Sequence, residues 1–278
     1  MGIFDGCLLA SDIDGTLLTK GKIPNINLEK IDWFKSEGGI FTICTGRTPN
    51  AARYSYELSH SNAPLIAFHG GGIYDYSKKA FISQTLLPME CRKVVKTIME
   101  AFPEIGIEVH SGLELYVVQG NNVIFEHAEY EDLTFSKSPE NLDIEPWNKV
   151  FFGVTDEATV RKLESYTRRF AGEDCRFMVT QVRENACYLE MVPKAVNKGY
   201  ALRQLKESVG AKISFGIGDY YNDTELVRDA DIGAVTAGAP EDLKQIADYV
   251  ACPCEEGSVA DFIDKIALYM KGSSIWTK

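Results

Sequence analysis

Short apolar segments alternate with helix-like segments at both ends of the chain, and this alternation limits the possible folds more than any other feature of the sequence. The first apolar segments are residues 7–10, 40–44 and 65–68. Each is bounded by Gly, Asp or Pro and followed by polar turn residues, a pattern typical of buried parallel strands. Between the first two, residues 27–37 carry apolar side chains at roughly helical spacing and end at Gly38 and Gly39, which predicts a β-α-β unit.

The same alternation returns in the C-terminal part of the chain. Predicted strands there are residues 213–217, 232–235 and 249–251, and predicted helices are residues 198–209, 224–229 and 240–247. Strands and helices that alternate in this way indicate an α/β fold, in which a Rossmann-like parallel sheet is covered by helices on both faces.

The middle of the chain, residues 84–192, has a different pattern that is richer in strands. Its clearest strand-like segments are residues 149–155, 175–180 and 186–192. Residues 120–122, Gly-Asn-Asn, lie between two further strand-like runs and are typical of a hairpin turn. We therefore expect residues 1–83 plus 193–278 to form the α/β core, with residues 84–192 as an inserted α+β module.

The charge of the chain excludes several classes of partner. Its 278 residues carry a formal net charge of -11 at pH 7. Nucleic acids and anionic membranes bind to basic faces, so we expect neither as a partner. The N-terminus has no basic segment ahead of an apolar one, and no run of about 18 apolar residues occurs, which together predict a cytoplasmic chain.

Cysteine and histidine usage argues against a disulfide framework or a zinc site. The seven cysteines are scattered without a C-x-x-C pair, and the four histidines form no H-E-x-x-H motif. In a chain expected to remain in a reducing compartment, this pattern predicts free thiols. Zinc is not expected, because the usual ligand spacings are missing.

Polar residues follow the predicted parallel strands where these strands end. Ligands of open parallel sheets bind at this edge, so these residues are candidates for one common site. They are Asp12 and Asp14, then Thr45, Gly46 and Arg47, then His69, then Asp219, Asn222 and Asp223, together with Lys198 at the start of a predicted helix.

The candidate residues suit phosphoryl transfer. Several carboxylates in one pocket repel one another unless a cation lies between them, and an oxygen-only ligand set suits Mg²⁺. A carboxylate such as Asp12 can attack phosphorus and form an aspartyl-phosphate. Asp14 can protonate the leaving oxygen and later deprotonate water. Thr45 and Lys198 can bind phosphoryl oxygens and offset negative charge, so a Mg²⁺-dependent site is predicted.

Four motifs in this order resemble those of the haloacid dehalogenase superfamily of phosphatases. They are Asp12-Ile13-Asp14-Gly15-Thr16, Thr45-Gly46-Arg47, Lys198 within VPKAVNKGYAL, and Asp219-Tyr220-Tyr221-Asn222-Asp223. The insert between the second and third motifs resembles the α/β type-two cap of the Cof-type, sugar-phosphatase-like branch. Residues 247–263 resemble the C-terminal segment of that branch. The resemblance covers nearly the whole chain, and it implies a catalytic core with an inserted cap that selects the substrate.

The resemblance also implies a role for each motif residue. Asp12 is expected to be the nucleophile, and Asp14 the general acid/base that lends its backbone carbonyl to the metal. Gly15 and Thr16 are expected to form the turn after the nucleophile. The expected metal ligands are Asp12, Asp14, Asp219 and Asp223, with Asp223 in a supporting position. The expected phosphate- and substrate-binding residues are Thr45, Gly46, Arg47, Lys198 and Asn222.

Three places depart from the pattern of this branch, and all surround the predicted pocket. Many relatives have Asn-Gly, Asn-Ala or small residues where this chain has His69-Gly70, Gly238-Ala239 and Tyr220-Tyr221. Substrate choice is expected to depend on such positions. For His69 a structural role and a substrate contact both stay open. The HGGG run also resembles an esterase oxyanion loop, but no G-x-S-x-G supplies a serine nucleophile.

The expected function is Mg²⁺-dependent hydrolysis of a small phosphorylated metabolite, such as a sugar phosphate. A phosphotransferase or mutase uses the same aspartyl-phosphate and passes the group to a sugar hydroxyl, so this alternative stays open. A phosphorylated signalling module also combines carboxylates, Thr and Lys, but it is a compact single domain without such an insert. A silent binding protein is disfavoured because every expected catalytic group is present. The sequence does not indicate an oligomeric state.

Overall fold

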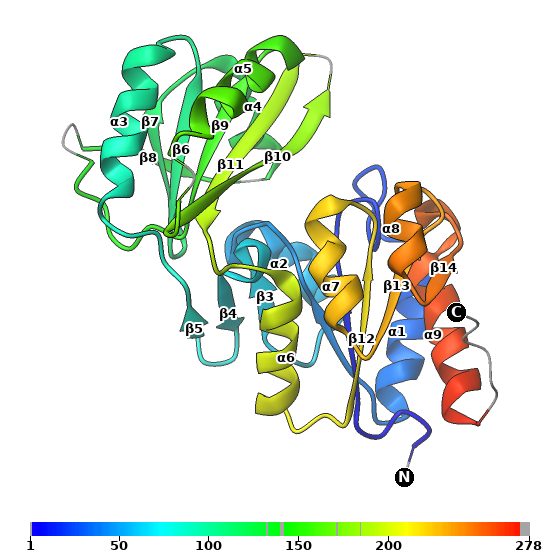
Figure 1. Ribbon diagram of the computed structural model, residues 1–278. Coiled ribbons are helices and arrows are strands. Elements are labelled where there is room, and N and C mark those ends of the chain that lie inside the picture. The colour runs from blue at the N-terminus through cyan, green and yellow to red at the C-terminus, as the bar shows by residue number, and fades with distance from the viewer. Residues whose placement is uncertain (1, 132, 140–141, 171, 184, 273–278) are drawn as a thin grey trace. The chain divides into compact units, whose positions relative to one another are not determined.

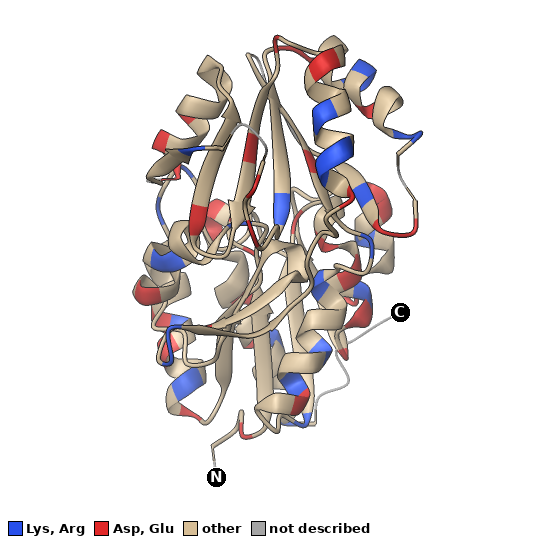
Figure 2. Ribbon diagram, turned by 90° about the vertical axis from the view of Figure 1, so that its left-hand side faces the viewer, with Lys and Arg blue, Asp and Glu red and all other residues tan. Residues whose placement is uncertain are grey.

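The computed structural model describes residues 2–131, 133–139, 142–170, 172–183 and 185–272 (Figure 1). The chain divides into two compact units. Unit 1 consists of Met1–Ser83 and Asn197–Lys278, and unit 2 consists of Gln84–Val196. In the view of Figure 2, acidic and basic residues are interspersed over the helices of both units. Among the described residues, no helix combines the length and the apolar character needed to cross a membrane.

Unit 1 is built on a five-stranded parallel sheet with the order β14-β13-β12-β1-β2. Its strands are β1 Cys7–Ser11, β2 Ile40–Ile43, β12 Ile213–Gly218, β13 Ile232–Thr236 and β14 Tyr249–Ala251. Strand β1 lies inside the sheet and is buried at every position, which explains the apolar run of residues 7–10. The predicted α/β fold with a parallel sheet is confirmed.

Helices cover both faces of this sheet, and alternate residues of β1 point to them. Leu9 packs in one hydrophobic cluster with residues of α1 (Asn25–Ser36) and α9 (Ser258–Met270). Leu8 packs in another cluster with residues of α6 (Lys198–Ser208) and α7 (Thr224–Asp229). The remaining helical elements of the described part of unit 1 are α2 Pro49–Leu58, α8 Glu241–Ile246 and the short turns η1 Phe68–Gly70, η2 Tyr221–Asp223 and η3 Cys254–Glu256.

The third predicted strand differs from the expectation. The segment β3 (Leu65–Ala67) pairs antiparallel with β4 (Gly72–Asp75), which belongs with β5 (Ala80–Gln84) to a separate small sheet. Only an isolated parallel bridge from Cys44 to Ile66 links β3 to the end of β2. The chain reverses at η1, where His69 has a φ of 57°, and this reversal ends the strand before Phe68. The predicted strand over residues 65–68 thus forms over Leu65–Ala67, but its parallel pairing is limited to the bridge at Ile66, and its main pairing is antiparallel, with β4.

Unit 2 is built on a six-stranded sheet with the order β10-β11-β9-β6-β7-β8. Its neighbouring strands are antiparallel except β7 and β8. The strands are β6 Gly106–Ser111, β7 Glu114–Gln119, β8 Phe135–Lys137, β9 Lys149–Val154, β10 Cys175–Arg183 and β11 Ala186–Pro193. Helices α3 (Cys91–Ala101) and α5 (Glu157–Thr167) share one hydrophobic cluster with the sheet.

The hairpin predicted at residues 120–122 is wrong, because a helix begins there. Asn121 is the N-cap of α4 (Asn122–Tyr130), and its Oδ1 accepts a hydrogen bond of 3.0 Å from the Ile124 amide. Its Nδ2 donates to the Gly153 carbonyl at 3.1 Å. Asparagine suits turns and helix N-caps alike, and here the cap is the one that forms.

A buried histidine–carboxylate cluster lies between α4 and the strand β6. Glu108 is fully buried, and its carboxylate lies 3.0 Å from His127 Nδ1 and 3.2 Å from His110 Nε2. Burial disfavours a charged His127, but hydrogen bonds with Glu108 and Glu131 outweigh it and raise the pKa of His127 to about 10. For His110, burial is the largest influence and lowers its pKa. The cluster therefore holds one charged and one neutral imidazole at neutral pH.

This arrangement predicts that the chain loses stability at alkaline pH. Because folding raises the pKa of His127 from its ordinary value of 6.5, the contribution of His127 to stability is complete below pH 6.5 and is lost as the pH rises towards 10. We expect urea unfolding to show a loss on the order of 3 kcal/mol across this range that is absent in His127→Gln. The titratable groups that influence His127 or its neighbour His110 are Glu108, Glu131, Lys149 and the two imidazoles themselves. The difference between the two pH profiles reports on His127 when the other groups have the same protonation in both proteins.

The exposed His60 of unit 1 provides the matched control for this measurement. Its ring lies 3.1 Å from Asp32 at the surface, where an ion pair contributes little to stability. We expect His60→Gln to retain the wild-type pH profile. An unchanged profile in His127→Gln would instead show that the buried cluster does not control the alkaline loss.

Candidate active site

The candidate site lies at the carboxyl ends of the parallel strands of unit 1. Asp12 follows β1, Thr45 follows β2 and Asp219 follows β12. Because β1 lies between β2 and β12 in the sheet, the loops that follow these three strands are neighbours. Thr16 in the loop after β1 contacts Asp219 in the loop after β12, although the two residues are 203 positions apart in the chain. The start of α6 adds Lys198 to the same place. Sequence motifs that are far apart in the chain thus form one site.

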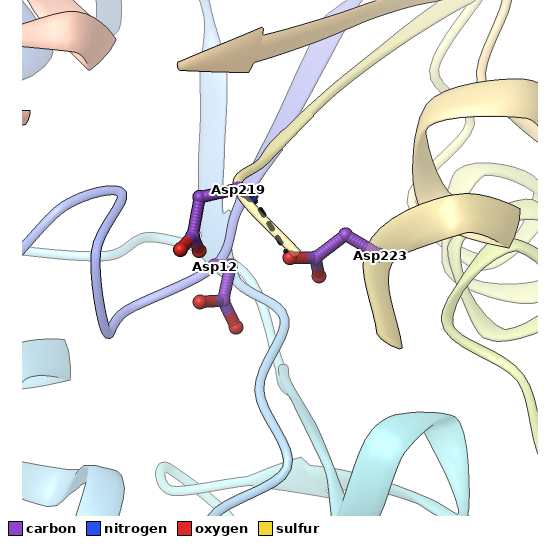
Figure 3. A group of neighbouring side chains, drawn as sticks. All are labelled: Asp12, Asp219 and Asp223. Atoms are coloured by element: carbon purple, nitrogen blue, oxygen red, sulfur yellow. Dashed lines mark hydrogen bonds between the residues drawn. The ribbon is translucent and has the colours of Figure 1, made fainter. Parts of the chain in front are cut away.

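Three carboxylates converge in this site, as Figure 3 shows for Asp12, Asp219 and Asp223. One oxygen of each lies within 4.8 Å of the other two. Asp12 and Asp223 are buried, with exposed fractions of 5% and 0%. Burial, opposed by Lys198 and reinforced by the neighbouring carboxylates, raises the pKa of Asp12 well above its usual value. Burial and the charge of Asp223 raise the pKa of Asp219 to about 7.

Lys198 is fully buried and supplies positive charge to two of these carboxylates. Its Nζ donates to Asp12 Oδ1 at 2.6 Å and to Asp223 Oδ1 at 2.5 Å. Burial lowers the pKa of Lys198, but Asp12 and Asp223 outweigh this effect and raise it, so the ammonium stays charged. Three carboxylates around one ammonium still leave an excess of negative charge in a buried place.

The backbone around Lys198 depends on a close approach at Gly70. Asn197 caps α6, because its Oδ1 accepts a hydrogen bond of 2.6 Å from the Tyr200 amide. A Cβ atom on Gly70 would lie 2.3 Å from the Asn197 carbonyl oxygen, and Gly70 has a φ of 95°. Only glycine tolerates both conditions, so the HGGG run serves the placement of α6.

Asp223 organises the loop that carries Asp219. Its Oδ2 accepts hydrogen bonds from the backbone amides of Asp219 at 3.1 Å and Tyr220 at 3.4 Å, while its Oδ1 faces Lys198. A Cβ atom on Gly218 would lie 2.4 Å from the Asp223 side chain. Asn222 directly precedes Asp223 in η2.

Asp14 does not join the three-carboxylate group with its side chain. Its carboxylate forms a two-point ion pair with Arg47, whose Nε and Nη2 lie 2.8 and 2.7 Å from its two oxygens. The Asp14 side chain is 49% exposed, whereas that of Arg47 is 12% exposed. This pairing gives Arg47 a contact that the sequence did not indicate, and it holds the Asp14 carboxylate at a defined position.

Thr45 and His69 lie on the β2 side of the site. Thr45 is buried, and its Oγ1 accepts a hydrogen bond of 3.2 Å from the Arg47 amide. His69 is also buried, and a Cβ atom on Gly46 would lie 2.2 Å from its ring. The ring therefore packs directly against Gly46, which explains why this position has no side chain.

Thr16 contacts the site although the sequence suggested only a turn for it. Its Oγ1 donates to Asp219 Oδ1 at 2.9 Å. Gly15 precedes it with a φ of 81°, and a Cβ atom there would lie 2.3 Å from Asp219 Oδ2. The Asp-Gly-Thr segment thus packs against the Asp219 carboxylate through its backbone and one hydroxyl. No local pattern marks this contact, because the two residues come from opposite ends of the chain.

The donor set of this site fits Mg²⁺. The three-carboxylate group offers only oxygen ligands, which is the ligand chemistry that Mg²⁺ takes in proteins. A divalent cation would also offset the negative charge that Lys198 leaves uncompensated.

Comparisons with known proteins agree with this geometry. A family model of haloacid dehalogenase-like hydrolases matches residues 9–263. The chain is 25% identical over 260 residues to 5-amino-6-(5-phospho-D-ribitylamino)uracil phosphatase YcsE of Bacillus subtilis, covering 92% of this chain and 94% of YcsE.

Solved structures show the same fold. A haloacid dehalogenase-like hydrolase from Bacteroides thetaiotaomicron superposes with a TM-score of 0.82 at 23% identity, covering 95% of this chain and 99% of that one. The subclass IIB sugar phosphatase BT4131 superposes with a TM-score of 0.78 at 19% identity, covering 94% and 99%. The resemblance expected from the four motifs is confirmed. This chain belongs to the haloacid dehalogenase-like hydrolases and is an enzyme of the phosphoric monoester hydrolase type.

Proposed function

We propose that the chain is a Mg²⁺-dependent phosphatase that hydrolyses a small phosphorylated metabolite, with sugar phosphates as the substrate class, through an aspartyl-phosphate on Asp12. The observation that carries this proposal is the contact of Asp12 with Lys198 inside the three-carboxylate group. The Lys198 ammonium donates a hydrogen bond to Asp12 Oδ1. We therefore propose that the other carboxylate oxygen, Oδ2, attacks phosphorus.

In the first step, Asp12 Oδ2 forms a bond to phosphorus while the bond from phosphorus to the substrate oxygen breaks. Asp14 in its protonated form gives a proton to that leaving oxygen. In the second step, water attacks the phosphoryl group, Asp14 takes the water proton, and phosphate leaves with regeneration of the Asp12 carboxylate. Arg47 holds the Asp14 carboxyl group in a defined position through two hydrogen bonds, and we propose that Asp14 acts from this position on the leaving oxygen and on water.

Asp12 and Asp219 are the side chains proposed to hold Mg²⁺, with the backbone carbonyl of Asp14 and with Asp223 in support. When bound, the cation would polarise the phosphoryl oxygens and neutralise charge that develops during transfer. Thr45, the backbone at Gly46 and Lys198 are proposed to bind the remaining phosphoryl oxygens. Asn222 is proposed to lie near the phosphate from its position in η2.

Two relatives support the choice of substrate class. By their names, YcsE acts on a phosphorylated ribitylamino compound and BT4131 on sugar phosphates. Both names describe a phosphate ester on a small polyhydroxylated carbon chain. We propose the same class for this chain, and we propose that unit 2, the α+β insert, is the cap that selects the leaving group.

Phosphate release from a panel of phosphorylated sugars, polyols and nucleotides tests this function. With purified chain and millimolar Mg²⁺, we expect turnover of at least one sugar or polyol phosphate. Removal of the metal with EDTA should abolish it, and added Mg²⁺ should restore it, because the carboxylate group then regains its cation. Turnover that persists in EDTA would contradict the metal requirement. Transfer of phosphate to an added acceptor sugar, without free phosphate, would favour a phosphotransferase instead.

A further inference from the structure

The carbonyl group of Thr16 anchors the turn after the nucleophile to the C-terminal part of unit 1. The Thr16 carbonyl oxygen accepts hydrogen bonds from Ser258 Oγ at 2.7 Å and from Cys254 Sγ at 3.1 Å. Thr16 and Ser258 are fully buried, and Cys254 is nearly so. Water therefore does not replace the Ser258 hydroxyl, and the two hydrogen bonds fix the peptide plane that follows Thr16.

A second connection joins the same two segments one residue further along. Asn27 is fully buried, and its Nδ2 donates to the Leu17 carbonyl at 3.4 Å. Its Oδ1 accepts a hydrogen bond of 2.9 Å from the Ala260 amide in the first turn of α9. The beginning of α9 thus holds the Thr16 carbonyl directly through Ser258 and the Leu17 carbonyl indirectly through Asn27 of α1.

We infer that Ser258, with Cys254 as a weaker partner, is a positioning residue for the metal ligand Asp219 and acts through Thr16. This inference rests on the proposed function only in treating Asp219 as a ligand of Mg²⁺. Thr16 has a β-branched side chain with restricted rotation about χ1, so its hydroxyl follows the position of its backbone. That hydroxyl donates to Asp219 Oδ1, which fixes the rotation of the carboxylate.

The surroundings of Asp219 explain why this restraint is needed. A cavity of about 450 Å³ opens beside Asp219, with Gly15, Cys254 and Glu255 among its lining residues. On that side the carboxylate has open space instead of packed neighbours. Without the hydrogen bond from Thr16, Asp219 can rotate towards the cavity, and the cation loses a ligand that is already in position.

Titration calorimetry of Mg²⁺ binding tests the inference without an activity assay. We expect Thr16→Val to raise the Kd for Mg²⁺ about tenfold, because it removes the hydrogen bond to Asp219 directly. Ser258→Ala should raise it about three- to fivefold, and Cys254→Ala about twofold, because these changes only loosen the Thr16 backbone. The double variant Thr16→Val/Ser258→Ala should match Thr16→Val alone, since both changes act on one path. Thr16→Ser keeps the hydroxyl and should stay close to the wild type.

Ser59→Ala is the matched control for Ser258→Ala. Ser59 is a buried serine of unit 1 whose Oγ donates to the Tyr56 carbonyl at 3.2 Å, away from the turn. We expect it to leave the Kd unchanged. An unchanged Kd in folded Ser258→Ala, or an equal rise in Ser59→Ala, overturns the inference, as does a wild-type chain that binds no Mg²⁺. A chain that binds Mg²⁺ with these ratios and hydrolyses no monoester would overturn the proposed phosphatase function alone.

Discussion

Asp12→Asn is expected to abolish phosphate release, with kcat lower by roughly 10⁴-fold or more. An amide oxygen is a poor nucleophile towards phosphorus, so the covalent step has no substitute within the site. The fold should survive the change, because asparagine has nearly the same shape and removes a buried carboxylate whose pKa is already raised by burial. The measurement is steady-state phosphate release, together with acid-quenched mass spectrometry of the phosphorylated peptide.

The surface residue Asp264 provides the control for this substitution. Its carboxylate is 52% exposed and pairs with Lys30, outside the three-carboxylate group. We expect Asp264→Asn to keep wild-type turnover. In the wild type, the quenched phosphate should lie on the peptide that contains Asp12. Substantial turnover in Asp12→Asn, or phosphate on another residue, would show that Asp12 is not the nucleophile.

The parallel sheet of unit 1 was predictable because its strands are buried on both faces. A strand such as β1 must then be continuously apolar, and the polar residue that follows it marks the edge where ligands bind. This reasoning predicted correctly that Asp12, Thr45, Lys198 and Asp219 follow strands or start helices at one edge. The roles of these residues stay predictions until the variants are measured.

Features that depend on one local conformation were not predictable. Phe68, His69 and Gly70 all have positive φ values where the chain turns from β3 back into β4. The sequence does not predict this turn, because phenylalanine and histidine adopt such a conformation only rarely. At Asn121 the sequence was compatible with both a turn and a helix cap, and in the fold its side chain caps α4 and also donates to the Gly153 carbonyl in β9.

Contacts between residues that are far apart in the chain could not be predicted from the sequence either. The hydrogen bond between Ser258 and Thr16 joins residues 242 positions apart, and the ion pair of Arg47 with Asp14 joins residues 33 apart. Each involves residue types that are common at protein surfaces. Only the fold shows that these serine and arginine side chains contact the segment that follows β1.

Lys198→Met is expected to remove activity and to destabilise the metal-free fold together. Methionine has a similar length but no charge, so Asp12 and Asp223 would face each other in a buried place without the ammonium that lies 2.6 and 2.5 Å away. Removal of one partner from a buried ion pair costs about 3–5 kcal/mol. We expect this loss in urea unfolding of metal-free protein at pH 7.5, and a fall in kcat of at least about 10³-fold.

A second substitution separates the charge effect from simple loss of packing. In Lys198→Met/Asp12→Asn one buried carboxylate is also gone, so part of the lost stability should return while activity stays absent. Lys206→Met removes the partly exposed ion pair with Asp231 at 2.6 Å, and it should cost less than about 1 kcal/mol. If Lys198→Met were as stable as Lys206→Met, the buried carboxylates would not need the ammonium. If the double variant regained nothing, the loss would come from altered packing of the methionine side chain and not from uncompensated charge.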